Sequence, residues 1–156
     1  MNIKQNLIET FQFNEKANLR LLTKLEQLQD PAEAIRLFSH LINCMDKWHD
    51  RLIVFPEISR LDWWEPLFSF EEMKTEWPRC SQKWIAFMES KTEEEIMQPI
   101  QWIGVEDVPF TARLYDIALQ LNYHSVHHRA QMQTMIRQQG MKPDFLDYIG
   151  TVARKV

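Results

Sequence analysis

Apolar residues recur every three or four positions along four long stretches of this chain, at residues 3–29, 31–55, 69–90 and 111–140. This spacing places apolar side chains on one face of an α-helix, whereas a half-buried strand alternates with a period of two. An amphipathic helix must bury its apolar face against a neighbour. The pattern therefore predicts an all-α fold, an antiparallel four-helix bundle, formed as a single domain over residues 1–156.

Local signals mark where these helices begin and end. Ser69 followed by Glu72 is a capping box for the third helix, in which Pro78 predicts a kink or an early break. Pro56 is expected to stop the second helix near residue 55, and Gly140 to end the last one. These signals place each helix end within a few residues.

The segment before the last long helix carries the weakest helical pattern. Residues 100–110 contain β-formers around Gly104, which favours a short hairpin or an irregular segment. After Pro143, the last residues of the chain are expected to form a short extra helix.

Composition excludes several classes of partner. The 18 basic and 22 acidic residues give a net charge of −4, which disfavours nucleic acid because phosphate binding needs concentrated positive charge. No stretch approaches the ~20 apolar residues of a membrane span, and the first residues lack the apolar core of a signal peptide. We therefore expect a soluble, cytoplasmic protein without a nucleic-acid or membrane partner.

Three of the five histidines lie in the run LNYHSVHHRAQM of the last helix. His124 and His128 are four residues apart, so their imidazoles stack on one helix face and can reach one metal ion. Both occupy core positions, where two explanations remain open: a metal site, or core histidines hydrogen-bonded to facing side chains. His127 lies one step off this face, at the edge of the bundle.

The histidine run is not a zinc-protease motif, because no glutamate stands beside His124 to act as general base. A third ligand must come from another helix. His40 and His49 both lie on the second helix, and the apolar periodicity does not choose between them.

Two segments together resemble a known family. LFSHLINCMDKWHDRL, followed far downstream by NYHSVHHRAQMQTMIRQQG, is similar to the DinB-like (DinB/YfiT) superfamily of four-helix-bundle metalloenzymes. Ala130 stands where the family shows glycine, a change that leaves the candidate ligands intact. The matching residues are His40, Trp48, Asn122, His124, His128, Arg129, Gln131, Gly140 and Pro143.

The resemblance implies a three-histidine site at His40, His124 and His128 for a divalent ion, zinc or nickel, and it selects His40 over His49. Some relatives are thiol-S-transferases that use bacillithiol or glutathione-like cofactors, and one is a mycothiol-dependent isomerase. The resemblance thus implies a metal-dependent thiol-S-transferase or hydrolase acting on a small molecule, with a low-molecular-weight thiol as cofactor, in a homodimer. The alternative is a non-catalytic metal-binding sensor or stress-response protein.

Arg129 and Gln131 follow the candidate ligand His128 on the last helix. Gln131 is expected either to hydrogen-bond a ligand or a bound water, or to make a helix–helix hydrogen bond. Arg129 is expected to pair with an acidic residue of another helix.

Four other residues bear on the site. Neither Cys44 nor Cys80 lies in the histidine run, so no protein thiol is expected there as a nucleophile or fourth ligand. Trp63 and Trp64 fall in the loop after the second helix, where they either wall a substrate cleft or only pack the loop.

Overall fold

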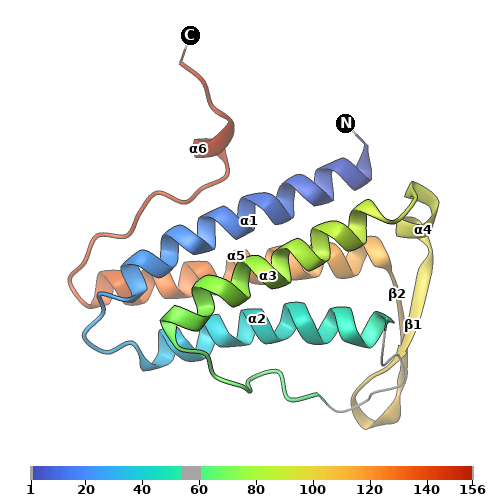
Figure 1. Cartoon of the computed structure of the whole chain (residues 1–156), viewed down its shortest axis with the longest axis horizontal. Coiled ribbons are helices and arrows are strands. Elements are labelled where there is room, and N and C mark those ends of the chain that lie inside the picture. The colour runs from blue at the N-terminus through green and yellow to red at the C-terminus, as the bar shows by residue number, and fades with distance from the viewer. Residues whose placement is uncertain (1, 54–60, 156) are drawn as a thin grey trace.

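The computed structural model describes residues 2–53 and 61–155, and most of them are helical. The four long helices are α1 (Ile3–Leu25), α2 (Ala32–Ile53), α3 (Phe70–Glu89) and α5 (Leu114–Gln138). Smaller elements are α4 (Glu93–Met97), β1 (Pro99–Ile103), a 3₁₀ turn (Val105–Asp107), β2 (Pro109–Arg113) and α6 (Ile149–Val152). The long helices lie side by side in Figure 1. The prediction of a mostly helical chain with four long helices is confirmed.

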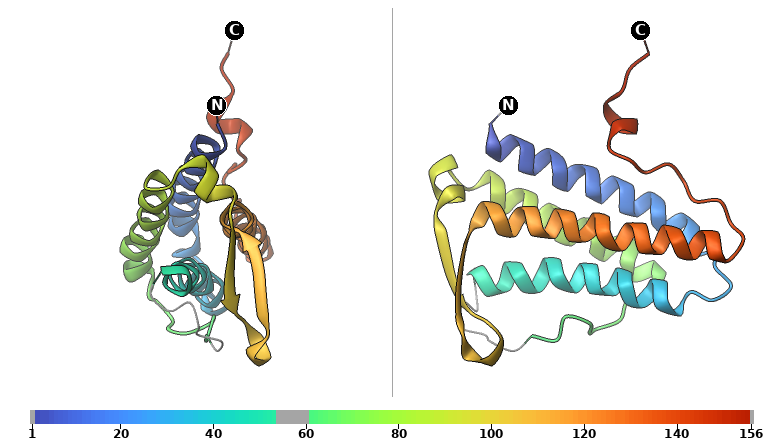
Figure 2. Two further views of the ribbon diagram at one scale, coloured as in Figure 1. Left: turned by 90° about the vertical axis from the view of Figure 1, so that its right-hand side faces the viewer. Right: turned by 180° about the vertical axis from the view of Figure 1, so that it is seen from behind.

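The long helices do not simply alternate in direction. Figures 1 and 2 show α1 and α5 running one way and α2 and α3 the other. The expected antiparallel packing holds for α1 against α3 and for α2 against α5, whereas α2 and α3 are parallel neighbours. Sixteen residues separate α2 from α3 in the sequence. A chain of that length can span at most about 50 Å, more than the roughly 33 Å length of α2, so this order is possible.

The capping signals act much as the sequence predicts. The Ser69 hydroxyl accepts a hydrogen bond from the backbone N–H of Glu72, whose carboxylate accepts one from the Ser69 N–H. Of the two outcomes expected at Pro78, a kink or an early break, the early break is wrong: α3 continues through Pro78, and Trp77 and Cys80 are buried on either side of it. The expected stop of the second helix at Pro56 lies outside the described residues.

A two-stranded antiparallel hairpin precedes α5, as predicted. β1 pairs with β2 in the register that sets Pro99 opposite Arg113. At the turn, a side chain on Gly104 would put its Cβ 2.4 Å from the Phe110 ring. Because β2 continues to Arg113, the last helix begins at Leu114 rather than at the expected residue 111.

The core lies between the four long helices and is rich in aromatic rings. Trp77 and Trp84 are fully buried, and each indole N–H donates to a backbone carbonyl of a neighbouring helix, of Glu15 at 3.2 Å and of Met45 at 2.8 Å. These bonds lock α3 against α1 and α2.

None of the helices in the described residues has the length and apolar character that a membrane span requires.

Candidate metal centre

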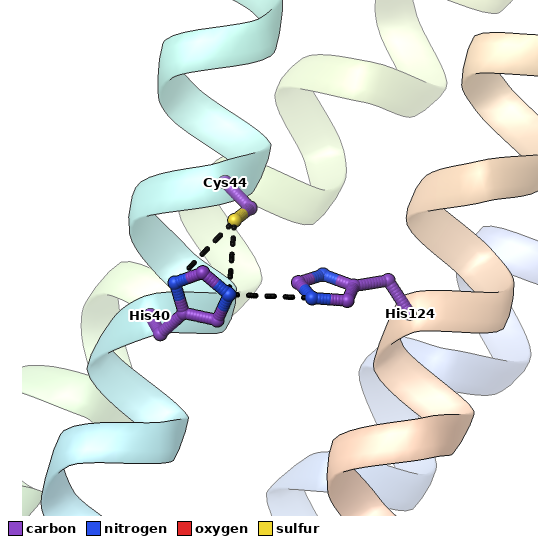
Figure 3. A group of neighbouring side chains, drawn as sticks. All are labelled: His40, Cys44 and His124. Atoms are coloured by element: carbon purple, nitrogen blue, oxygen red, sulfur yellow. Dashed lines mark hydrogen bonds between the residues drawn. The ribbon is translucent and has the colours of Figure 1, made fainter. Parts of the chain in front are cut away.

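Three imidazoles meet between α2 and α5. His40 comes from α2, and His124 and His128 lie one turn apart on α5. The Nε2 atom of His124 is 3.2 Å from Nε2 of His40 and 2.9 Å from Nε2 of His128. Figure 3 shows the His40 and His124 rings reaching toward each other across the gap between the two helices. The structure therefore brings together the three residues that the resemblance selects.

Hydrogen bonds on the far side of two rings fix where their protons lie. Nδ1 of His40 is 2.7 Å from the backbone oxygen of Trp63, and Nδ1 of His128 is 2.6 Å from Oε1 of Gln131. Both oxygens only accept, so each Nδ1 must donate, and a neutral imidazole then has a bare lone pair on Nε2. Two lone pairs therefore face His124, whose single N–H can satisfy only one of them.

Burial keeps these imidazoles neutral. Burial, reinforced by the positive fields of His128 and His40, lowers the pKa of His124 to about 4. Burial also lowers the pKa of His40 and of His128, although the hydrogen bonds of their Nδ1 atoms oppose the shift. Neutral imidazole is the form that binds metal ions, so the three rings are in the ligating state at pH 7.

A cysteine adjoins the cluster, contrary to expectation. Cys44 Sγ lies 3.6 Å from Nε2 and 3.7 Å from Nδ1 of His40, and Figure 3 shows it one turn along α2. The donor atoms of His40, Cys44 and His124 all lie within 4.8 Å of one another. Burial raises the pKa of the Cys44 thiol to about 12, although the Lys47 charge opposes the shift. The signal was present in the sequence, because His40 and Cys44 have the same four-residue spacing as His124 and His128.

The two loop tryptophans also contact the cluster. The Trp64 ring stacks on the His40 imidazole at a centroid distance of 3.9 Å and an interplanar angle of 15°. Trp63 supplies the carbonyl that orients His40, and its own ring lies 5.9 Å from that of Trp48. The loop therefore covers one side of His40 as well as packing against α2.

Comparison with known proteins identifies the family of this chain. The family model of the DinB superfamily matches residues 20–132. The chain belongs to the DinB superfamily. The matched segment contains all three clustered histidines and Cys44. Searches of the curated proteins and of the solved structures found no match.

The other two histidines of this DinB-superfamily chain have different surroundings. His49 lies against α3, with its ring 5.8 Å from that of Trp84 and 5.3 Å from that of Phe87. His127 is exposed, and its ring centroid is 5.0 Å from that of His128. The structure thus brings His40, and not His49, to the histidines of α5.

Arg129 does not make the acidic pair expected from the sequence. Its side chain is buried, and Nη1 donates to Oδ1 of Asn14 at 2.8 Å and to Oδ1 of Asn18 at 3.0 Å. No carboxylate forms an ion pair with Arg129 among the residues that the structure describes. Burial lowers the pKa of Arg129 to about 10. Arg129 therefore ties α5 to α1 next to His128 in the DinB-superfamily fold, through two asparagines of α1 instead of a carboxylate.

Proposed function

We propose that this chain is a metal-dependent enzyme whose centre is formed by His40, His124 and His128. One observation supports this most directly: three Nε2 atoms converge, and two of them present lone pairs to the third. Such a group of acceptors repels itself unless a cation lies among them. A divalent ion, zinc or nickel, fits these neutral nitrogen donors.

The chain's own residues hold and orient the ligands. The Trp63 carbonyl and the Gln131 side chain each accept an Nδ1–H bond, which turns the opposite Nε2 of His40 and of His128 toward the centre. A bound divalent ion supplies Lewis acidity, which favours the ionised form of a water or a thiol. The proposed reaction is attack of that nucleophile on a small electrophile.

Thiol transfer suits the surroundings better than hydrolysis does. No glutamate stands beside His124 to deprotonate water, whereas a thiol is closer to its ionisation range and needs less help. The Lys47 ammonium donates to the backbone oxygens of Asp62 and Glu65, and its positive charge acts on both His40 and Cys44. Burial lowers the pKa of His40 and raises that of the Cys44 thiol; the Lys47 charge adds to the first shift and opposes the second.

A second function is supported by the cover over His40. Trp64 stacks directly on the His40 ring, and Arg36 lies over the Trp64 indole, with Cζ 4.1 Å from a ring centroid. A hollow of about 510 Å³ lies elsewhere, between α1 and the residues around Tyr148. An ion held beneath such a cover suits a non-catalytic metal-binding or sensor protein.

Metal loading with a thiol screen separates the two functions. Chelator-treated protein is loaded with Zn²⁺, Ni²⁺ or Mn²⁺ and assayed with low-molecular-weight thiols and electrophiles, then with an ester, amide and lactone panel. We expect turnover that disappears with chelator and in His40→Ala. If every loaded form is inactive while the ion raises the melting temperature, the enzyme proposal fails and the binding function replaces it.

A further inference from the structure

We infer that Cys44 is a fourth protein ligand, so that the centre combines three imidazoles with one thiolate. This inference rests on the proposed metal site and specifies its donor set. Thiols are not among the ligands implied by the three-histidine resemblance. Cys44 lies one turn after His40 on α2, which places its thiol beside His40 and His124.

Two of the donor separations are close to those that a single tetrahedral ion imposes. With Zn–S near 2.3 Å and Zn–N near 2.05 Å, a tetrahedral angle sets S and N about 3.6 Å apart and two N atoms about 3.4 Å apart. Cys44 Sγ is 3.6 Å from Nε2 of His40, and the Nε2 atoms of His40 and His124 are 3.2 Å apart. Little movement is therefore needed to bring these three donor atoms onto one ion, whereas the Nε2 atoms of His124 and His128, 2.9 Å apart, must separate slightly to share it.

The two cysteines of the chain have contrasting surroundings. Cys80 is fully buried in α3, and its thiol donates to the Trp77 backbone oxygen at 3.2 Å, an ordinary interaction within one helix. Cys44 is also buried, but its thiol contacts are with the two ring nitrogens of His40. Cys80 is therefore a matched control for substitutions at Cys44.

A thiolate changes which ions the centre prefers. Sulfur ligands favour zinc, copper and cobalt over manganese and magnesium, and one thiolate reduces the net charge of the divalent site from +2 to +1. Four protein ligands leave a substrate only a fifth coordination position, which zinc accepts. The inferred donor set thus predicts a thiophilic and strongly held ion.

Cobalt spectroscopy tests the sulfur ligand directly. Co²⁺ is titrated into chelator-treated wild type, Cys44→Ala, Cys44→Ser and Cys80→Ala, with folding checked by circular dichroism. We expect an intense near-ultraviolet thiolate-to-cobalt band in wild type and Cys80→Ala, and none in either Cys44 variant. Zinc affinity, measured by competition with a chromophoric chelator, should fall more than about 100-fold in Cys44→Ala, since outer-shell changes alone cost about 10–100-fold.

X-ray absorption of zinc-loaded wild type gives an answer that needs no variant. One sulfur scatterer at about 2.3 Å is expected. Bound metal with only nitrogen and oxygen scatterers, or cobalt bound without the charge-transfer band, overturns the role of Cys44 and leaves the imidazole site standing. Wild type that binds neither cobalt nor zinc overturns the proposed metal centre itself, and the sulfur ligand with it.

Discussion

Replacing Gln131 by Ala removes the acceptor of the 2.6 Å hydrogen bond from His128 Nδ1 and leaves every proposed ligand in place. The Gln131 side chain is exposed and packs into no core, so the fold should tolerate its loss. In the metal-bound protein Nε2 is committed to the ion, and Nδ1–H must then find another partner. We therefore expect weaker metal binding with little change in the stability of the metal-free protein.

Two estimates give the same size for this effect. His128 is only 7% exposed, so its freed Nδ1–H has little access to water. An unsatisfied buried donor costs about 1–3 kcal/mol. Outer-shell partners of metal-binding histidines are worth about 10–100-fold in affinity, which is about 1.4–2.7 kcal/mol. The Kd of Gln131→Ala for Zn²⁺ should therefore rise by about one to two orders of magnitude.

Isothermal titration with Zn²⁺ at pH 7.5, with a competing chelator where binding is tight, measures the change. Gln138→Ala is the matched control, because Gln138 is an exposed glutamine on the same helix, two turns beyond Gln131. Equal Zn²⁺ affinity in the two variants would refute the orienting role. So would a fall in affinity matched by an equal loss of stability in the metal-free protein, since that pattern belongs to a purely structural residue.

Four further outcomes follow from the structure. His40→Ala should lower metal affinity sharply and His49→Ala should leave it nearly unchanged, as measured by the same titration; the opposite order would show that the wrong histidine of α2 was assigned. The pKa of His124 is about 4 in the folded chain against the usual 6.5, so the unfolded chain binds a proton at this residue first as the pH falls. Urea unfolding of the metal-free protein should therefore show stability falling from pH 6.5 toward pH 4, and falling less in His124→Gln. Asn14→Leu should cost roughly 2–4 kcal/mol in urea unfolding, because it removes an acceptor from buried Arg129; a loss below 1 kcal/mol would contradict this. The homodimer remains a prediction, for which light scattering should give twice the 18.8 kDa of one chain, and a monomer at micromolar concentration would refute it.

The helices and most of their ends could be predicted because their causes are local. Apolar spacing, the Ser69–Glu72 capping box and the residues around Gly104 act within a few positions of chain, so each can be read without a partner element. Pro78 is the exception: its local effect is real, but burial of the neighbouring α3 residues outweighs it. Local signals could not predict the relative direction of α2 and α3, because a long connection allows two helices to pack either parallel or antiparallel.

The candidate site divides in the same way. Pairing of His124 with His128 follows from the α-helix itself, because residues four apart share a face whatever the tertiary structure. The resemblance added His40. The same spacing linked His40 with Cys44, but the sequence does not say which way that face of α2 turns.

The packing of the helices decided which other side chains lie beside these histidines. The rotation of α2 about its axis aims Cys44 at the imidazoles, and the loop after it brings Trp64 over His40. The position of α5 against α1 places Arg129 beside two asparagines instead of a carboxylate. Such contacts join residues far apart in the chain, and they depend on how whole helices rotate and slide, which no short-range spacing encodes. The sequence alone therefore determined which helices form and which histidines pair, while the tertiary structure decided which other side chains lie beside those histidines.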